Sequence, residues 1–491
     1  MHFISKIRAL KGNYTWWATV VVSLGTLVTV ADTGEVGVAL PNIATDLDTN
    51  LVDVQWLVTG YMLAISVFLL PMGRLADMIG RKKVYLWGIT IFTIGSGLAC
   101  VSPDFSALVF FRILQGIGLG LVHGNSMAIM TLVFGPKHRG KALGIQMTMV
   151  GMGLVIGPLL GGFLVGSIGW RAVFFANVFL GLLVLVLGIF VLNEKLDIRM
   201  KKNDGPGGFD FPGIFLSAFF LIFFLFAMVN PFDWTITFQV MIFVLSILLV
   251  SVFVFWEIKT NTPMFDVMLF KNRLFALGVA ARSITFVCSS TTLFLMPFYL
   301  QDVLSFDPNK VGLFMTTLAL GLVVFGPLSG KMSDIVDWRI FAVLGSVMSS
   351  IGFFMLVFIG LDTSLWLILP ALLLQSSGMG LFTPANSNAI LGVVPESRVG
   401  ISTGFVQLLR TASTVTGVAL ATMIISGFMH SSGFEANIKD IVYAADPGIA
   451  ISFVSGLRVV YLIAASLQLT VVGISLMSEG GKKNERLSVS G

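Results

Sequence analysis

Stretches of about 20 mainly apolar residues recur along the whole chain and constrain its fold more than any other feature. A helix of about that length crosses a bilayer and satisfies its own backbone hydrogen bonds there. About fourteen such stretches can be counted in the 491 residues, so the sequence predicts an all-α polytopic membrane protein. The predicted spans are residues 15–39, 54–73, 83–101, 106–133, 141–166, 171–192, 211–230, 236–257, 273–300, 309–330, 338–361, 364–391, 400–429 and 455–477.

The positions of the charged residues follow a membrane topology. Only 11% of the chain is charged, against about 25% for a soluble domain. With both termini cytoplasmic, 23 of the 30 Lys and Arg residues fall in the N-terminal segment, the cytoplasmic loops and the tail. This positive-inside distribution predicts a multi-pass protein of a cell membrane, with a bacterial inner membrane as the expected place. It also explains the net charge of +5 without a nucleic acid partner.

A charged segment, GRLADMIGRKKVY, separates the second and third predicted spans. We expect a compact loop at the membrane surface that takes part in conformational change. Its first glycine lets two helix ends approach, its aspartate can face a helix N-terminus, and its basic residues hold it on the cytoplasmic side. The candidate residues of this loop are Gly73, Arg74, Asp77, Gly80, Arg81 and Lys82.

Two loops recur about 257 to 259 residues later, which indicates an internal duplication. Gly330, Lys331 and Asp334 repeat the spacing of the first loop, and Pro395 with Arg398 repeats Pro136 with Arg139. The repeat predicts two six-helix bundles, with two inserted helices in the surplus residues. We divide the chain into an N-terminal bundle (1–193), a linker with two inserted spans (194–260), a C-terminal bundle (261–480) and a cytoplasmic tail (481–491).

This pattern resembles the major facilitator superfamily, and within it the fourteen-helix drug/proton antiporters of the multidrug and quaternary-ammonium efflux type. The likeness rests on the charged segment above and on VQWLVTGYML, FRILQGIGLG, GPLLGG and GWRAVFFANV, which occur in that order. It implies a major facilitator fold and export of small molecules by proton-coupled antiport with alternating access. It implies no enzyme activity, cofactor or metal, and we expect a monomer in the lipid bilayer whose partners are protons and a small-molecule substrate.

The fifth predicted span carries glycines four residues apart, Gly153, Gly157 and Gly161, which lie on one helix face. Small residues at that spacing let another helix backbone approach, and Pro158 bends the rod. Together with Gly162, these residues resemble the antiporter signature of the superfamily. Ordinary glycine-rich packing is the alternative, and the expected partner surface in the tenth span is Gly326, Pro327 and Gly330.

Acidic and basic side chains inside spans are costly and therefore mark candidate sites. Asp32 and Arg112 are predicted at similar depths and could pair; the family resemblance associates this arginine with proton coupling. Glu35 lies one turn after Asp32, and two poorly solvated carboxylates would favour sharing a proton. We therefore hypothesise a site that accepts protons and attracts a cationic substrate. The alternatives are a purely structural ion pair and a hydrated, unimportant Glu35.

Three further charged or titratable side chains complete the candidates. His123 lies eleven residues after Arg112, on a similar helix face, and is either a proton relay or a packing group. Arg282 and Arg410 lie in the ninth and thirteenth spans as gate residues or as partners of an anionic headgroup. The predicted substrate is an amphipathic cation. The alternative is an endogenous anionic amphiphile such as a lipid, siderophore or fatty acid.

Overall fold

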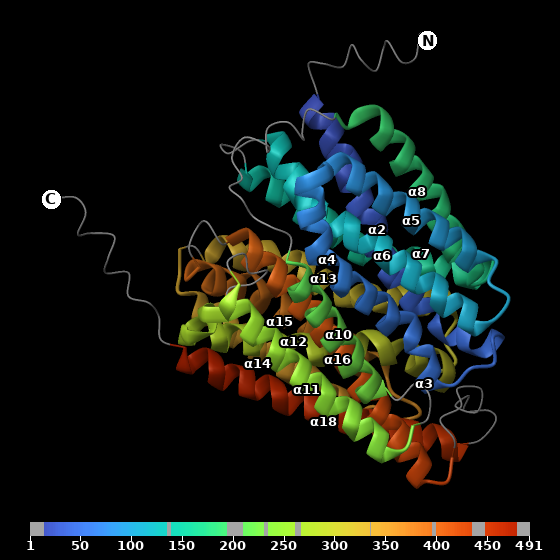
Figure 1. Cartoon of the computed structure of the whole chain (residues 1–491). Coiled ribbons are helices and arrows are strands. Elements are labelled where there is room, and N and C mark those ends of the chain that lie inside the picture. The colour runs from blue at the N-terminus through green and yellow to red at the C-terminus, as the bar shows by residue number, and fades with distance from the viewer. Residues whose placement is uncertain are drawn as a thin grey trace.

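The computed structural model describes residues 14–134, 139–193, 210–229, 234–260, 267–333, 335–394, 399–434 and 447–478, and within these ranges it is helical (Figure 1). Fourteen long helices occupy the fourteen predicted places. They are α2 (Tyr14–Asp46), α4 (Trp56–Ile79), α5 (Arg81–Cys100), α6 (Phe105–Phe134), α7 (Arg139–Ser167), α8 (Arg171–Val191), α10 (Phe211–Val229), α11 (Ile236–Lys259), α12 (Arg273–Phe298), α13 (Pro308–Met332), α14 (Trp338–Leu356), α15 (Leu365–Gly392), α16 (Val399–Ser431) and α18 (Pro447–Met477).

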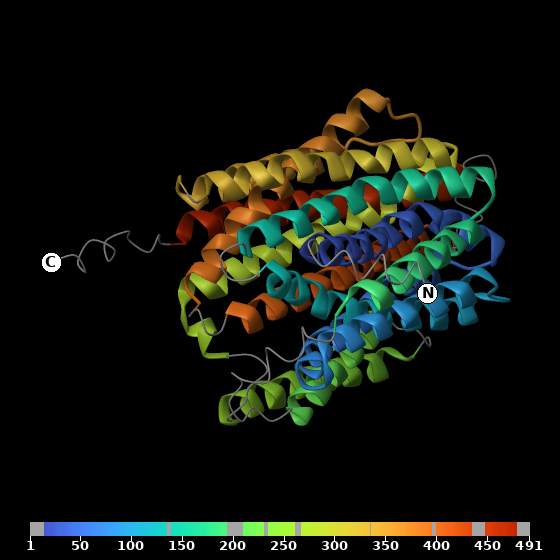
Figure 2. The same cartoon turned by 90° about the horizontal axis from the view of Figure 1, so that it is seen from above.

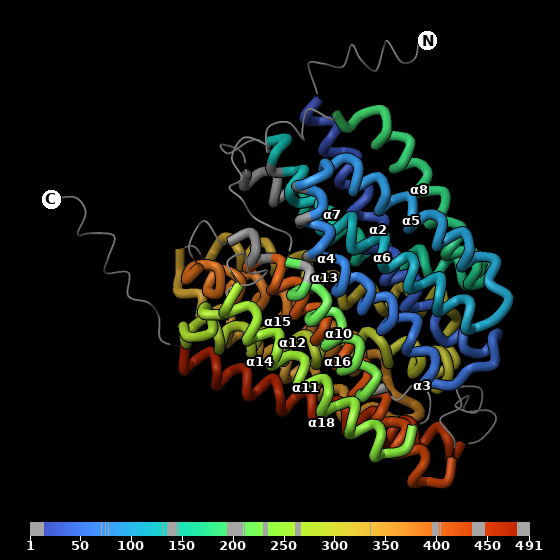
Figure 3. The backbone as a smooth tube through the Cα atoms, in the orientation of Figure 1, coloured from blue at the N-terminus to red at the C-terminus, as the bar shows by residue number. Residues whose placement is uncertain are grey.

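Most of these helices are long and apolar enough to cross a bilayer. Thirteen meet that description among the described residues, and the apolar part of α10, Pro212–Met228, is shorter. Because the helices alternate in direction, the start of α2 and the end of α18 lie at the same end of the bundle, as Figure 3 traces. We call this the termini end and the opposite one the far end. The short helices α3 (Leu51–Val54) and η4 (Tyr299–Val303) lie at the far end.

The long helices form two halves, seen side by side in Figures 1 and 2. Helices α2 to α8 pack on one another, as do α12 to α18. The halves meet along a seam where α7 packs on α13 and α4 packs on α16. The inserted helix α10 packs on α11, α4 and α16, so it lies beside one edge of the seam. This confirms the predicted fold class; the domain limits within 194–209 and 261–266 lie outside the described residues and stay predictions.

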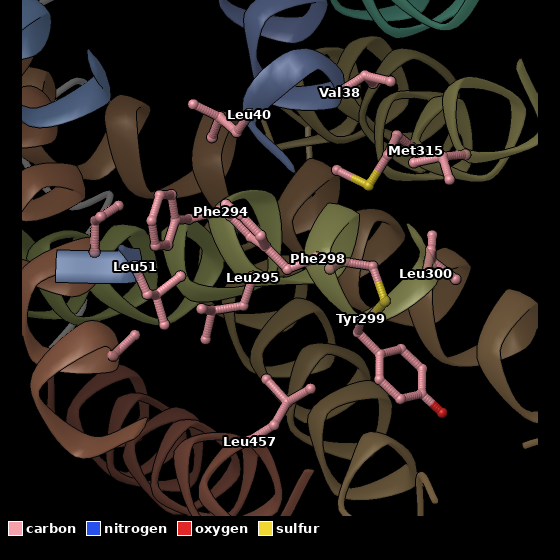
Figure 4. Packing of buried hydrophobic residues seen from close by; sticks show 14 of the residues in the cluster. Val38, Leu40, Leu51, Phe294, Leu295, Phe298, Tyr299, Leu300, Met315 and Leu457 are labelled. Carbon is pink, nitrogen blue, oxygen red and sulfur yellow. The ribbon is translucent and has the colours of Figure 1, made fainter. Parts of the chain in front are cut away.

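One apolar cluster joins the two halves, and it lies at the far end. It includes residues from the far-end portions of α2, α7 and α8 in one half and of α12, α13, α16 and α18 in the other. The other buried apolar clusters of the described residues each draw on a single half. The halves are therefore sealed together at the far end. Figure 4 shows part of this seal, including Val38, Leu40, Leu51, Phe294, Leu295, Phe298 and Met315.

The predicted charged loop is almost entirely helical, which corrects the expectation from the sequence. Helix α4 continues to Ile79 and α5 begins at Arg81, so only Gly80 breaks the helical run, with a φ of 113° that favours glycine. Gly73 lies within α4, and a Cβ there would lie 3.6 Å from the Gly124 carbonyl oxygen of α6. Lys82 Nζ donates to the Ile189 carbonyl at 3.3 Å. The side chains of Arg74 and Asp77, and residues 136, 334, 395 and 398, lie outside the described part.

Candidate functional site

A stripe of polar side chains runs along α2 at three-residue spacing, and each member is buried in the N-terminal half. Its members are Thr26, Thr29, Asp32 and Glu35, with exposed fractions between 0 and 2%. Residues three apart adjoin on a helix surface, but each step turns by about 60°, so the four side chains wind around the rod and face different neighbouring helices. Partners come from three neighbouring helices: Gln146 of α7, His123 and Arg112 of α6, and Asn177 of α8.

The first two members of the stripe make neutral contacts. Gln146 Nε2 donates to Thr26 Oγ1 at 2.6 Å, and His123 Nε2 lies 3.3 Å from Thr29 Oγ1. His123 therefore sits one helical turn before the carboxylates, on the side toward the termini end. The prediction that His123 and Arg112 face similarly agrees with this arrangement, because both contact α2.

Arg112 and Asp32 form a buried ion pair, as their predicted depths suggested. Arg112 Nη1 lies 2.8 Å from Asp32 Oδ2 and 3.1 Å from Asp32 Oδ1. The same nitrogen donates to Gln115 Oε1 at 2.9 Å, and Arg112 Nε donates to the Leu57 carbonyl at 3.2 Å. The guanidinium also lies 3.8 Å from the centroid of the Tyr61 ring. These contacts fix the arginine in one orientation.

Asn177 joins the two carboxylates. Its Nδ2 donates to Asp32 Oδ1 at 3.0 Å and to Glu35 Oε2 at 3.3 Å. The other oxygen, Glu35 Oε1, is buried and has no hydrogen-bond partner among the described residues. Glu35 is 0% exposed, so the alternative of a hydrated Glu35 is wrong for this conformation. The site thus holds two carboxyl groups and one cation in a dry environment.

The carboxyl groups lie behind Arg112 as seen from the seam between the halves. A cavity of about 20 Å³ at the seam is lined by Arg112 and Tyr61 of the N-terminal half and by α12 and α16 of the other. Helix α2 contributes Thr33, Val36, Gly37 and Leu40 to this cavity, but neither Asp32 nor Glu35. The Glu35 side chain turns toward the N-terminal bundle instead, where Asn177 of α8 donates to it, and Gly161 of α7 packs on its backbone. In this conformation neither carboxyl group lines the cavity.

The glycines of α7 form the contact with α2 that surrounds this site. An added Cβ at Gly157 would lie 2.5 Å from the Ala31 carbonyl oxygen, and one at Gly161 would lie 2.6 Å from the Cα of Glu35. At Gly153 it would lie 2.9 Å from the Cβ of Val30. Real Cβ atoms do not approach backbone this closely, so glycine is required for α7 to sit against the acidic turn of α2.

The next glycine of α7 faces the other half. An added Cβ at Gly162 would lie 2.6 Å from the Pro308 carbonyl oxygen and 3.0 Å from the Cα of Gly312. The predicted partner helix is therefore right, but the predicted partner residues are wrong. An added Cβ at Gly326 would meet nothing within 4 Å, and one at Gly330 would meet Pro384 of its own half. Helix α7 thus links the acidic turn of α2 to the seam.

Arg282 of α12 and Arg410 of α16 share one aromatic side chain. Their guanidinium carbons lie 5.6 Å and 5.9 Å from the centroid of the Phe286 ring. Arg282 Nη1 donates to Ser387 Oγ at 2.5 Å, and Gln407, with its amide turned to accept, takes a hydrogen bond from Arg410 Nη2 at 2.6 Å. Neither arginine forms an ion pair within the described ranges.

Two helical halves that meet along a seam, with charged groups buried beside it, define a multi-pass membrane transport protein. The chain belongs to the Major Facilitator Superfamily, whose model matches residues 22–281 and 278–472. The described residues contain no group of three His, Cys, Asp or Glu side chains that could hold a metal ion.

Relatives and solved structures agree with this family. The riboflavin transporter RibZ of Clostridioides difficile (strain 630) is 28% identical over 88% of this chain and 93% of its own length. The tetracenomycin C resistance and export protein of Streptomyces glaucescens is 26% identical over 96% of this chain and 93% of its own. Among solved structures, the chain is similar to a bacterial homologue of the human lysosomal transporter Spinster in an inward-facing and unoccupied conformation. The TM-score is 0.65 at 15% identity, and the match covers 95% of this chain and 98% of the other. That last likeness supports the fold.

Proposed function

We propose that this chain is a proton-coupled antiporter that exports amphipathic small molecules by alternating access. The observation that carries the proposal is the buried group of Asp32, Glu35 and Arg112, in which one cation faces two carboxyl groups. Charges at this depth are costly to insert, and an uncompensated carboxylate is more costly still. A transport protein that only moved neutral solutes down their gradients would have no use for it.

Charge balance assigns one proton to this group in the present conformation. Arg112 neutralises Asp32 through two short contacts, whereas Glu35 receives a single hydrogen bond, from Asn177. An ionised Glu35 would leave a buried oxygen without a donor and a net negative charge in a dry site. We infer that Glu35 carries a proton here, with Asp32 as the ionised member of the pair.

The polar stripe gives that proton a route toward the termini end. Thr29 and His123 lie one turn from Asp32, and Thr26 with Gln146 lies a turn further on. We propose His123 as a relay between the carboxyl groups and the interior side. The charge distribution predicts that the termini are cytoplasmic. On that topology the sealed far end is the outer one, and we propose that this conformation is the inward-facing, protonated state, ready to release a proton and take a substrate.

Two observations support small amphipathic substrates. The seam cavity itself has room for about one water molecule, but the residues of both halves around it are mainly apolar with a few polar ones, among them Thr33, Ser290 and Thr414, and this lining suits an amphipathic molecule once the halves separate. Two relatives are a riboflavin transporter and a tetracenomycin C resistance and export protein, and both of these compounds contain fused rings. By analogy we propose ring-bearing or chain-bearing amphiphiles as the exported class.

The substrate's charge has two candidates. A cationic substrate, as the sequence predicted, requires that Asp32 or Glu35 become exposed to the seam in another conformation. An anionic amphiphile is favoured by a specific observation: the charged groups that face the seam here are arginines, since Arg112 lines the cavity and Arg282 and Arg410 lie on the same helices as its C-terminal lining.

Transport into inside-out membrane vesicles tests the proposed function. With riboflavin and ethidium as probes and an acid-inside gradient, wild-type vesicles should accumulate at least one probe while their lumen loses protons. Glu35→Gln should lose gradient-driven accumulation, and Asp307→Asn, which removes an exposed acid at the start of α13, should not. Wild-type uptake that is insensitive to the gradient, or full activity of Glu35→Gln, would contradict the proposal.

A further inference from the structure

We propose that Arg282 and Arg410 form a subsite that binds the carboxylate or phosphate group of an anionic amphiphile. The proposal rests on the export function above, because it names the charge class of the substrate. It concerns the C-terminal half and depends on contacts that are separate from those of Asp32 and Glu35.

The first argument is that the two cations are held close together. Both guanidinium groups pack on the Phe286 ring, at 5.6 Å and 5.9 Å from its centroid. Like charges in a poorly solvated place repel each other. An anion between them would remove that repulsion.

The second argument is that the hydrogen-bond partners of both arginines among the described residues are neutral, and that one donor of Arg282 has no partner there. Arg282 contacts the Ser387 hydroxyl, and Arg410 contacts the Gln407 amide. Arg282 Nε is buried and has no hydrogen-bond partner in the described part of the chain. Guanidinium groups favour bidentate contacts with carboxylates and phosphates, whose oxygens match their planar set of donors. The arginines therefore lack the kind of partner that their chemistry prefers.

The third argument is position. On α16, Thr414 and Val418 follow Arg410 at four-residue steps, and both line the seam cavity. On α12, Phe286 and Ser290 follow Arg282 at the same steps, and Ser290 lines the cavity too. Residues four apart lie on one helix face, so both arginines point along the seam, nearer the termini end. The apolar side chains beyond them, Leu293, Phe294 and Val418, suit a hydrocarbon tail once the halves separate.

Binding of decanoate to the purified full-length protein in a neutral detergent tests the subsite, with decyltrimethylammonium as the cation of the same chain length. Both ligands are titrated below their own critical micelle concentrations, and microscale thermophoresis should show that decanoate binds more tightly than decyltrimethylammonium. Arg282→Gln and Arg410→Gln should each weaken it about tenfold, since a hydrogen bond to a charged group is lost. Arg273→Gln, which removes an exposed arginine from the start of α12, should bind as wild type does.

A conservative pair keeps the test valid if a glutamine variant folds poorly. Arg282→Lys and Arg410→Lys retain the charge and lose the planar donor set, so they should bind decanoate with intermediate affinity. Equal decanoate affinity in wild type and in both glutamine variants would overturn the proposal. Preferential binding of decyltrimethylammonium by the wild type would also overturn it.

The anionic group could belong to a free amphiphile or to a membrane lipid. Repeating the decanoate titration in nanodiscs, with and without phosphatidylglycerol in phosphatidylcholine, separates these sources. Weaker decanoate binding in the presence of phosphatidylglycerol, seen in wild type and absent in the double glutamine variant, assigns the subsite to a lipid headgroup. Unchanged binding assigns it to a free amphiphile.

The same titration separates this proposal from the proposed function. Decanoate binding requires no proton gradient, so Glu35→Gln should retain the subsite while losing gradient-driven uptake. If the arginine variants bind decanoate normally and Glu35→Gln still loses uptake, the anion subsite is wrong and proton coupling stands. If the subsite is confirmed and Glu35→Gln transports normally, proton coupling at Glu35 is wrong.

Discussion

The two halves of the molecule treat buried charge in opposite ways. In the N-terminal half, Asp32 and Glu35 face their own cation, Arg112 of α6, and an amide donor, Asn177 of α8, and neither carboxyl group lines the seam cavity. In the C-terminal half, Arg282 and Arg410 have neutral partners and lie on helix faces that line the seam. The arrangement in the N-terminal half suits a proton that enters and leaves the buried carboxyl groups along one route. The arrangement in the C-terminal half suits an anionic group that arrives from outside the protein.

The comparison suggests how the two could be linked without direct contact between substrate and carboxyl groups. Arg112 lines the seam cavity and also forms an ion pair with Asp32, so this one side chain contacts both the cavity and the carboxyl group. Helix α7 touches the acidic turn of α2 through Gly161 and the C-terminal half through Gly162. A shift of α7 during alternating access would therefore act on the carboxyl groups and on the seam together.

The largest effect is expected from removing Arg112. Arg112→Gln leaves two buried carboxyl groups without a cation and should cost about 3–5 kcal/mol of stability. Thermal unfolding in detergent measures this, and Arg112→Gln combined with Asp32→Asn should recover part of the loss. Arg171→Gln breaks the ion pair with Asp46. Because the Arg171 and Asp46 side chains are 44% and 51% exposed, this substitution should cost about 1 kcal/mol of stability or less. Equal losses in the two single variants would contradict the assigned role of Arg112.

A smaller loss is expected from crowding the contact between α7 and α2. Gly157→Ala places a methyl group against the Ala31 backbone, and the required shift should cost about 1–3 kcal/mol. Gly326→Ala is the matched control, because its methyl group would meet open space. Unfolding midpoints and transport rates of the two variants check this. A harmless Gly157→Ala would show that α7 does not pack this tightly on α2 in the membrane.

The smallest effect is expected at the proposed relay. Thr29→Val keeps the shape of the side chain but removes its contact with His123, along with the hydroxyl's bonds to the Gly25 and Thr26 carbonyls of its own helix. Loss of the His123 contact corresponds to roughly a fivefold change in rate, so stopped-flow pH-indicator measurements should show slower proton release after a pH jump. Thr45→Val is the control, since it removes a hydroxyl that bonds to a carbonyl of its own helix, that of Pro41, near the far end. Equal release rates in both variants would remove the Thr29–His123 contact from the route.

The fold could be predicted from the sequence because each helix has to span the bilayer. Hydropathy reports the thickness of the apolar layer, however, and not the end of a helix. For this reason α2 continues past its predicted limit to Asp46, α4 continues to Ile79, and α18 begins at Pro447 and not at 455. The charged segment between the second and third spans, which we predicted to be a loop, is helical for the same reason.

The site could be predicted only in part. Asp32 and Arg112 were found because charges are rare in spans, but the donors that complete the site, Asn177 and Gln115, are uncharged and were not selected. A lone amide in an apolar span is itself unusual and would have been a usable signal. The direction of Glu35 could not be read from spacing, since an i, i+3 neighbour lies about 60° from Asp32 and could face the seam or the bundle. The hydrogen bond from Asn177 of α8 to the Glu35 carboxyl group decides that question.

Infrared difference spectroscopy of the purified protein during a pH titration tests most directly whether the N-terminal half holds an exchangeable proton. The account predicts that raising the pH removes a protonated-carboxyl band in the wild type, and that this band is absent in Glu35→Gln and present in Asp307→Asn. If Glu35→Gln shows the same band and the same titration as the wild type, Glu35 does not carry the transported proton, and the division of labour between the two halves is wrong.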